Sequence, residues 1–170
     1  MIQKKICMVG VYGTGKTCLV QQFVHSIFSV KYLSTVGVKI DKKQVMVGNE
    51  EVNLLLWDLE GRDGVRDITP SYIRGAHGII YVGDGTRKET VEQLLEIRAL
   101  VVDAVGDMPS VVALNKVDLV DDWKLTPGDE SIAGGPGVHR LRTSAKTGEG
   151  VEEAFQWLAE ATMSNPGNPK

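Results

Sequence analysis

One glycine-rich segment constrains the fold of this chain more than any other. An apolar run from Ile6 to Val9 leads into residues 10–17, GVYGTGKT, which have the spacing G-x-x-x-x-G-K-[ST]. The glycines let the backbone curl so that N–H groups face phosphate oxygens, and a following helix adds its positive end. We expect Lys16 to reach the β- and γ-phosphates and the hydroxyl of Thr17 to bind Mg²⁺. The alternative is an ordinary strand–turn–helix with glycines placed by chance, which the complete spacing disfavours.

The composition is that of an ordinary globular protein. Of the 170 residues, 42% are hydrophobic and 24% are charged, which predicts one domain over residues 1–164 with a short flexible tail at 165–170. The formal net charge of −3 argues against nucleic-acid binding. The two cysteines, Cys7 and Cys18, lack metal-ligand spacing and are expected to be buried reduced thiols. The tail has no cysteine for prenylation, and neither a signal peptide nor a membrane span is evident, so we expect a cytoplasmic monomer without a direct membrane anchor.

Strand patterns alternate with helical ones along the chain. Because the middle strands are almost entirely apolar, they are expected to be parallel and covered on both faces. With the phosphate-binding loop, this predicts an α/β P-loop NTPase fold, a six-stranded mostly parallel sheet with helices on both faces. Residues 121–137 carry so many glycines and prolines that any helix there should be short. The expected strands are 2–9, 37–47, 52–57, 78–82, 110–114 and 138–142, the expected helices are 16–25, 70–75, 86–103 and 150–163, and a hairpin turn is expected at 48–51.

A second motif predicts which base is bound. Residues 115–118 read NKVD, and an aspartate in this place can accept two parallel hydrogen bonds from the N1–H and exocyclic amine of guanine. Adenine would leave buried polar groups unpaired, which disfavours it by several kcal/mol, of order 10⁴-fold. The stem of Lys116 can cover the base. A third motif, Ser144-Ala145-Lys146, follows the last strand and is placed to offer backbone N–H groups to the guanine O6.

These motifs together resemble the Ras-like small GTPases, nearest to their Rab branch. The resemblance covers essentially the whole chain and includes Phe28, Tyr32, the segment STVGV at 34–38, Trp57-Asp58, and YIRGAHGIIYVGD at 72–84. It implies a switch that binds GTP or GDP with Mg²⁺, hydrolyses GTP and signals through two loops. It also implies partners, namely an effector, an activating factor and an exchange factor.

The resemblance assigns roles to individual residues of this chain. It implies catalytic roles for Lys16, Thr35, Gly61 and Arg62. It implies that Mg²⁺ is held by Thr17, Thr35 and, through a water, Asp58. Thr35 and Gly61 would also donate N–H groups to the γ-phosphate, and Phe28 would pack against the guanine. The nucleotide-binding residues implied in full are Gly13, Thr14, Gly15, Lys16, Thr17, Cys18, Phe28, Thr35, Gly61, Asn115, Lys116, Asp118, Ser144, Ala145 and Lys146.

Three residues depart from the family pattern near the γ-phosphate. Arg62 stands where the family has the glutamine that orients the attacking water, and an arginine cannot accept a hydrogen bond. It could instead neutralise charge on the transferred phosphoryl group, or it could be a solvated surface residue. Glu60 replaces a small residue and would repel the phosphate if it pointed inward. The ring of Tyr12 could cover the γ-phosphate.

Three functions follow from these observations. The first is a guanine-nucleotide switch with slow intrinsic hydrolysis. The second is a pseudo-GTPase scaffold that binds the nucleotide with negligible hydrolysis, which the departures favour. The third, an ATP-using enzyme, is opposed by residues 115–118. The missing lipidation cysteine implies that any membrane attachment comes through a partner, and it makes a prokaryotic origin an expectation.

Overall fold

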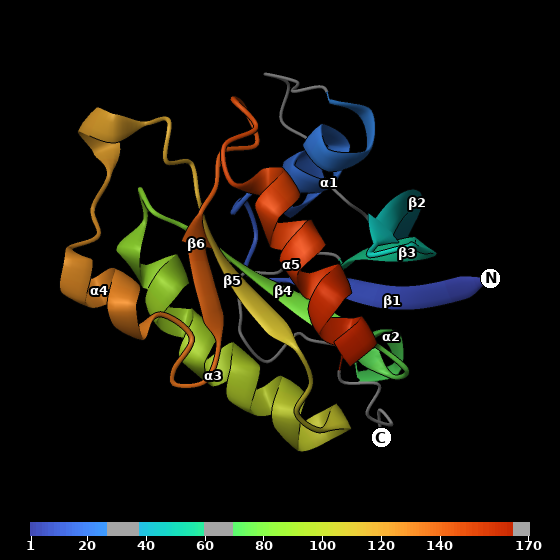
Figure 1. The fold of residues 1–170 in the computed structure, drawn as a ribbon. Coiled ribbons are helices and arrows are strands. Elements are labelled where there is room, and N and C mark those ends of the chain that lie inside the picture. The colour runs from blue at the N-terminus through green and yellow to red at the C-terminus, as the bar shows by residue number, and fades with distance from the viewer. Residues whose placement is uncertain (27–37, 60–69, 165–170) are drawn as a thin grey trace.

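The computed structural model describes residues 1–26, 38–59 and 70–164, and these form a six-stranded sheet in the order β2-β3-β1-β4-β5-β6 (Figure 1). The strands are β1 (Ile2–Val9), β2 (Val38–Val47), β3 (Glu50–Leu59), β4 (Gly78–Asp84), β5 (Ser110–Asn115) and β6 (His139–Arg142). The helices are α1 (Lys16–His25), α2 (Pro70–Ile73), α3 (Lys88–Val105), α4 (Pro127–Ile132) and α5 (Val151–Ser164), with a 3-10 turn at η2 (Val120–Asp122). Only β2 runs antiparallel to its neighbour among these strands, so the predicted α/β fold with a mostly parallel sheet is confirmed.

Both faces of the sheet are buried under helices. Successive side chains of a strand point to opposite faces, so Ile6 and Met8 join the core under α1 and α5, whereas Cys7 and Val9 join the core under α3. Figure 1 shows α1 and α5 on one side of the sheet and α3 on the other. This double burial is why β4, β5 and the second half of β1, Ile6–Val9, read as almost continuous apolar runs in the sequence.

The edge strand β2 is half-exposed, as predicted. Ile40 and Met46, on its outward face, are 52% and 50% exposed, while Asp41 lies on the partly buried face with Val45. The hairpin joining β2 to β3 is tighter than expected. Val47 pairs directly with Glu50, which leaves only Gly48 and Asn49 in the turn. The expected turn at 48–51 therefore loses its last two residues to β3.

One helix starts later than expected, and a second settles a segment for which no helix bounds were predicted. α3 begins at Lys88 rather than at Thr86, because the carboxylate of Asp84 accepts hydrogen bonds from the N–H and hydroxyl of Thr86 and holds that segment as a turn. α4 is a short helix of 6 residues, as its composition predicted. It begins at a capping box, in which Thr126 and Asp129 exchange side-chain to backbone hydrogen bonds.

The carboxyl ends of the parallel strands bring polar side chains to one edge of the sheet. Asp58 pairs in register with Met8 just before the glycine-rich loop, and Asp84 pairs with Asn115 across β4 and β5. Open parallel sheets bind ligands at this edge. The topology therefore gathers the glycine-rich loop, Asp58, Asp84 and Asn115 into one place.

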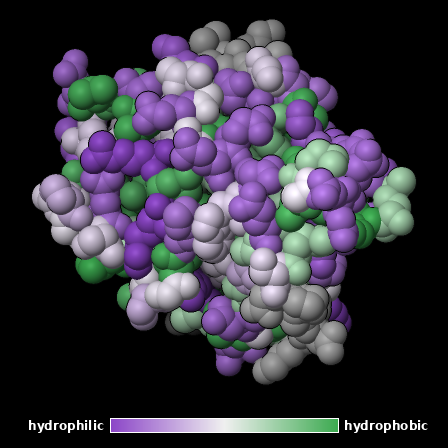
Figure 2. Space-filling model, in the orientation of Figure 1, coloured by the Kyte–Doolittle hydropathy of each residue, from purple (hydrophilic) through white to green (hydrophobic). Residues whose placement is uncertain are grey.

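The face of the molecule seen in Figure 2 is mostly polar. Figure 2 shows hydrophilic side chains spread over one face, with hydrophobic ones in small separate groups. Within the described ranges, none of the helices combines the length and the apolar character needed to cross a bilayer.

Candidate functional site

The glycine-rich loop connects β1 to α1, and its glycines are required by the geometry. Gly13 and Gly15 have φ values of +79° and +102°, a region that side-chain-bearing residues rarely adopt. A Cβ on Gly10 would clash with the carbonyl oxygen of Val82, and one on Gly15 would clash with the side-chain amide of Asn115. The loop thus passes close to the ends of β4 and β5, with no room there for side chains.

The first turn of α1 starts directly from this loop. Gly15 is the N-cap residue, and no side chain among the described residues caps the turn. The first N–H groups of a helix have no partner within it, and with the helix dipole they form a ready anion site. The N-terminus of α1 is thus suited to accept phosphate.

Lys16 lies folded against the loop. Its Nζ donates to the carbonyl oxygens of Gly10 at 3.0 Å and Val11 at 3.2 Å, and the residue is only 6% exposed. Burial lowers the pKa of Lys16 to about 8, while the carboxylate of Asp58 acts in the opposite direction. A negatively charged ligand beside Lys16 would stabilise its protonated form.

Thr17 and Asp58 lie together at the mouth of the site. The Thr17 hydroxyl donates to Oδ2 of Asp58 over 2.5 Å, and Asp58 is 1% exposed. A hydroxyl and a carboxylate are the oxygen ligands that Mg²⁺ prefers, so these residues fit the ion. No group of three or more His, Cys, Asp or Glu residues with metal-binding geometry occurs in the described part of the chain. Thr17 and Asp58 supply only part of the octahedral shell of Mg²⁺, so further oxygens would be needed to complete it.

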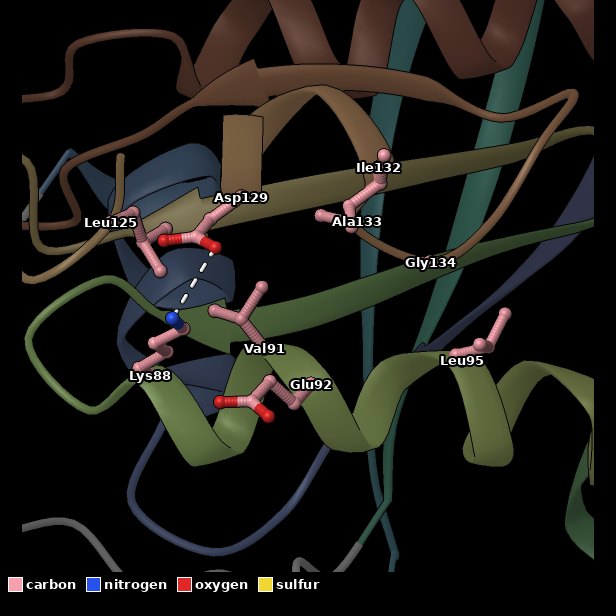
Figure 3. A pocket seen from close by; sticks show the side chains of 9 residues that line it. All are labelled: Lys88, Val91, Glu92, Leu95, Leu125, Asp129, Ile132, Ala133 and Gly134. Carbon is pink, nitrogen blue, oxygen red and sulfur yellow. Dashed lines mark ion pairs between the residues drawn. The ribbon is translucent and has the colours of Figure 1, made fainter. Parts of the chain in front are cut away.

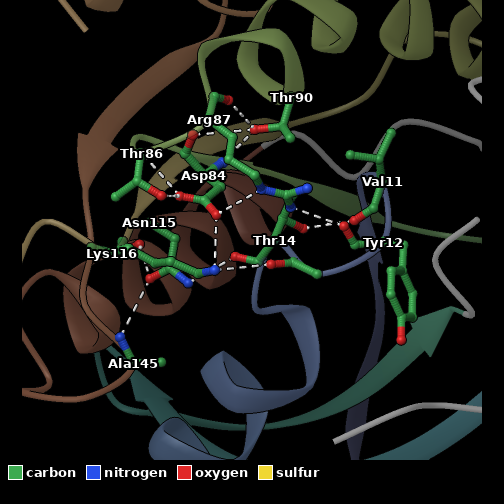
Figure 4. Close-up of polar contacts among 12 residues, drawn as sticks. Val11, Tyr12, Thr14, Asp84, Thr86, Arg87, Thr90, Asn115, Lys116 and Ala145 are labelled. Carbon is green, nitrogen blue, oxygen red and sulfur yellow. Dashed lines mark hydrogen bonds and ion pairs between the residues drawn. The ribbon is translucent and has the colours of Figure 1, made fainter. Parts of the chain in front are cut away.

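The NKVD motif is attached to the glycine-rich loop by two hydrogen bonds (Figure 4). Asn115 Nδ2 donates to the carbonyl of Thr14 at 3.0 Å, and Lys116 Nζ donates to the carbonyl of Gly13 at 3.0 Å. The two predicted motifs, a hundred residues apart in sequence, thus form one site.

The SAK motif meets the NKVD motif on its other side. Asn115 Oδ1 accepts from the backbone N–H of Ala145 at 3.3 Å, and Asp118 Oδ1 accepts from the Ser144 hydroxyl at 2.7 Å. Gln22 on α1 donates to the carbonyl of Ala145 at 2.7 Å. These contacts hold Asp118 beside the S-A-K turn, where the predicted guanine edge would lie. Gln22 is a supporting residue that the sequence analysis missed, because nothing in a helix pattern marks which polar side chain faces a distant loop.

A network centred on Asp84 was also missed. Asp84 is 1% exposed and receives the Thr86 hydroxyl at 2.6 Å, Arg87 Nε at 3.1 Å and Lys116 Nζ at 2.8 Å. Burial raises the pKa of Asp84, but the hydrogen bonds from Lys116 and Thr86 outweigh it, so the net pKa lies below its ordinary value. The one available clue was an acidic residue closing an otherwise apolar strand.

Several predicted site residues lie outside the described ranges or differ from expectation. Phe28, Thr35, Glu60, Gly61 and Arg62 fall outside the described residues, so their roles stay predictions. The thiol of Cys7 is fully buried, as expected, but that of Cys18 is only half-buried because it sits on the first turn of α1, beside the loop.

Two further site residues are exposed. Lys146 has an exposed side chain, and its carbonyl accepts a long hydrogen bond of 3.4 Å from Gln22. Tyr12 is 42% exposed, and Figure 4 shows its ring directed away from Asp84 and Lys116. Neither side chain is therefore enclosed by the described residues of the site.

A separate hollow of about 230 Å³ lies between α3 and α4 (Figure 3). Leu95 and Ile132 border it and are 58% and 71% exposed, and an ion pair of 3.4 Å joins Lys88 to Asp129 across it. The hollow shares no lining residue with the glycine-rich loop or with the NKVD and SAK motifs.

Comparison with known proteins agrees with this geometry. Residues 5–164 match the model of the Ras family. The chain is 37% identical over 161 residues to the Ras-related protein Rab-1 of Theileria annulata, covering 92% of this chain and 73% of the relative. It is 33% identical over 162 residues to the Ras-related protein Rab-8B of Homo sapiens, covering 94% of this chain and 78% of the relative. These relatives are eukaryotic and give no support to a prokaryotic origin. The chain belongs to the Ras family of small GTP-binding proteins, and its relatives carry Rab names.

Proposed function

We propose that this protein is a Mg²⁺-dependent guanine-nucleotide switch that hydrolyses GTP slowly to GDP and phosphate. The observation that carries the proposal is the direct attachment of the NKVD motif to the glycine-rich loop through Asn115 and Lys116. A base-recognising motif and a phosphate-binding loop fixed to one another suit a ligand that has a base at one end and phosphates at the other.

The nucleotide would lie along the edge of the sheet. Asp118, held by Ser144, would accept the N1–H and exocyclic amine of guanine. The N–H groups of residues 13–17 and the N-terminus of α1 would bind the phosphates. Lys16 would exchange its bonds to Gly10 and Val11 for phosphate oxygens, which suits a flexible ammonium with three donors.

Thr17 and Asp58 are the described residues that would hold Mg²⁺, with Thr35 completing the set. When bound, the ion would neutralise charge on the phosphates. In the hydrolysis step, a water attacks the γ-phosphorus and the bond to the β–γ bridging oxygen breaks. GDP leaves with that oxygen and its electron pair, and the attacking water gives up one proton to solvent as phosphate forms. Lys16, by then bonded to phosphate oxygens, would offset the developing charge.

The low rate is proposed from two residues that stand at family positions close to the γ-phosphate. Arg62 has no hydrogen-bond acceptor with which to orient a water, and Glu60 would repel the phosphate if it pointed inward. These residues favour a low rate of hydrolysis, and they do not affect the groups that bind the base.

The test is single-turnover GTP hydrolysis by the purified chain with Mg²⁺, beside Arg62→Gln. We expect a slow wild type and a rate at least about tenfold higher for Arg62→Gln, because glutamine restores an acceptor for the attacking water. Arg74→Gln is the matched control, since it removes the same charge from an exposed position in the turn just after α2 and should leave the rate unchanged.

Two results would change the proposal. A wild type that hydrolyses readily and is slowed by Arg62→Gln would give Arg62 a catalytic role of its own. A wild type and an Arg62→Gln variant that are both inert while binding GTP tightly would support the pseudo-GTPase scaffold, which Tyr12, Glu60 and Arg62 favour.

The switch would act through other proteins. Regulators and effectors are proposed on the strength of the family, together with a monomeric, cytoplasmic state. The division into a domain at 1–164 and a tail at 165–170 likewise stays a prediction.

A further inference from the structure

We propose that Arg87 is a positioning residue that turns the N–H group of Gly13 toward the phosphates of the nucleotide. The inference rests on the proposed nucleotide binding and adds a residue that lies outside all of the sequence motifs. Arg87 is the residue that precedes α3, and it reaches back to the glycine-rich loop (Figure 4).

Arg87 joins a buried carboxylate to the loop. Its Nε donates to Asp84 Oδ2 at 3.1 Å, and its Nη2 donates to the carbonyl oxygen of Tyr12 at 2.9 Å. Asp84 is 1% exposed and is itself fixed by Thr86 and Lys116, so it is a rigid anchor. The guanidinium group therefore connects the end of β4, through Nε, to the glycine-rich loop, through Nη2.

Arg87 completes a series of three contacts. The carbonyls of Tyr12, Gly13 and Thr14 accept hydrogen bonds from Arg87, Lys116 and Asn115 respectively, at 2.9, 3.0 and 3.0 Å. All three donors come from the ends of β4 and β5 or the residues just after them. Three consecutive carbonyls of the loop are thus drawn toward the same side.

The orientation of a carbonyl fixes the orientation of the next N–H. A trans peptide unit is planar, and its C=O and N–H point in opposite directions. When Arg87 holds the carbonyl of Tyr12 against the end of the sheet, the N–H of Gly13 must point the other way, toward the concave side of the loop. Lys116 and Asn115 do the same for the N–H groups of Thr14 and Gly15. Arg87 therefore prepares one of the donors that a phosphate would meet, and it does so without touching the ligand.

The test measures GDP dissociation from the full chain, with Arg87→Gln and Arg87→Lys. We expect Arg87→Gln to release GDP about tenfold faster, because a partly exposed charge-assisted hydrogen bond is lost. Lysine keeps the positive charge but lacks the planar fork that reaches Asp84 and Tyr12 from two separate nitrogens, so Arg87→Lys should lie between wild type and Arg87→Gln. Arg98→Gln is the matched control. Arg98, on α3, likewise donates to loop carbonyls, those of Gly134 and Pro136, but these belong to the loop after α4 rather than to the glycine-rich loop.

A second readout separates positioning from general destabilisation. Guanosine carries the base without phosphates, so its affinity, measured by calorimetry on nucleotide-free protein, should be unchanged by Arg87→Gln while the affinity for GDP falls. Equal losses for guanosine and GDP, or a GDP dissociation rate equal to wild type, would overturn the inference and leave the proposed function standing. A wild type that binds no GDP would instead overturn the proposed function, and the inference with it.

Discussion

Lys16 combines deep burial with a role that requires positive charge. Its pKa is lowered to about 8 in the nucleotide-free protein because burial removes water from the ammonium group. Phosphates beside it would raise that pKa, so nucleotide binding would take up a proton when the pH exceeds the free value. By linkage, the affinity for GDP then falls as the pH rises.

We therefore predict weaker GDP binding between about pH 7.5 and pH 9, approaching tenfold per pH unit at the upper end. Titration of GDP against the protein across this range is the measurement. Lys16→Arg is the control, because arginine stays charged throughout. If wild type and Lys16→Arg show the same pH dependence, the titrating group is not Lys16.

Gly15 is a loop position where both the backbone conformation and the neighbouring atoms exclude a side chain. With φ at +102° and Asn115 against it, Gly15→Ala combines backbone strain with a clash. We predict a loss of at least about 2 kcal/mol in the free energy of unfolding, together with faster GDP release, because Asn115 must leave the carbonyl of Thr14. Gly48→Ala is the control, since it has a φ of +60° and open space around it.

For that control we expect a cost of about 1 kcal/mol in urea unfolding and no change in GDP release. If the Gly15→Ala protein released GDP at the wild-type rate, the contact between Asn115 and the loop would not contribute to nucleotide binding.

Among the elements, α4 is a helix that is stabilised by a local capping interaction rather than by burial of its own side chains. Its capping box joins Thr126 and Asp129, and no residue of the helix is buried. We predict that Thr126→Ala lowers the free energy of unfolding by about 1 kcal/mol, because an N-terminal N–H loses its partner. GDP release should be unchanged, since α4 does not contact the glycine-rich loop.

Ser131→Ala, which removes an exposed hydroxyl from the same helix, should cost almost nothing in urea unfolding. A larger loss for Ser131→Ala than for Thr126→Ala would contradict the capping argument.

Elements with a strong local pattern were predictable from the sequence. β4, β5 and the second half of β1 were marked by almost continuous apolar runs, and the glycine-rich loop by its spacing. The start of α3 was misplaced by two residues because Asp84 accepts from Thr86, a contact that depends on local side-chain geometry rather than on periodicity. The network of Asp84, Lys116 and Arg87 could not be predicted from the sequence for a different reason. It depends on the register that places Asp84 beside Asn115, and only the assembled sheet fixes that register.

At the scale of the whole molecule, the parallel sheet brings motifs that are far apart in the sequence together at one edge. The loop after β1 and the segments after β4, β5 and β6 all emerge at the same edge, so residues from 10 to 146 meet there. The helices on both faces supply the buried core that keeps this edge fixed. Thr35, Gly61 and Arg62 fall in ranges 27–37 and 60–69, outside the described residues, so the roles that the family resemblance gives them stay predictions.

The most direct test of this account is a competition experiment on nucleotide binding. A fluorescent GDP analogue is bound with Mg²⁺ and displaced by GDP, GTP or ATP, using wild type and Asp118→Ala. We predict displacement of the wild-type complex by GDP and GTP, and none by ATP even at about a hundredfold excess, because adenine leaves the carboxylate of Asp118 unpaired. Asp118→Ala should lose this discrimination together with most of its affinity for GDP. Displacement by ATP as readily as by GDP, or no binding of GDP at all, would contradict the account.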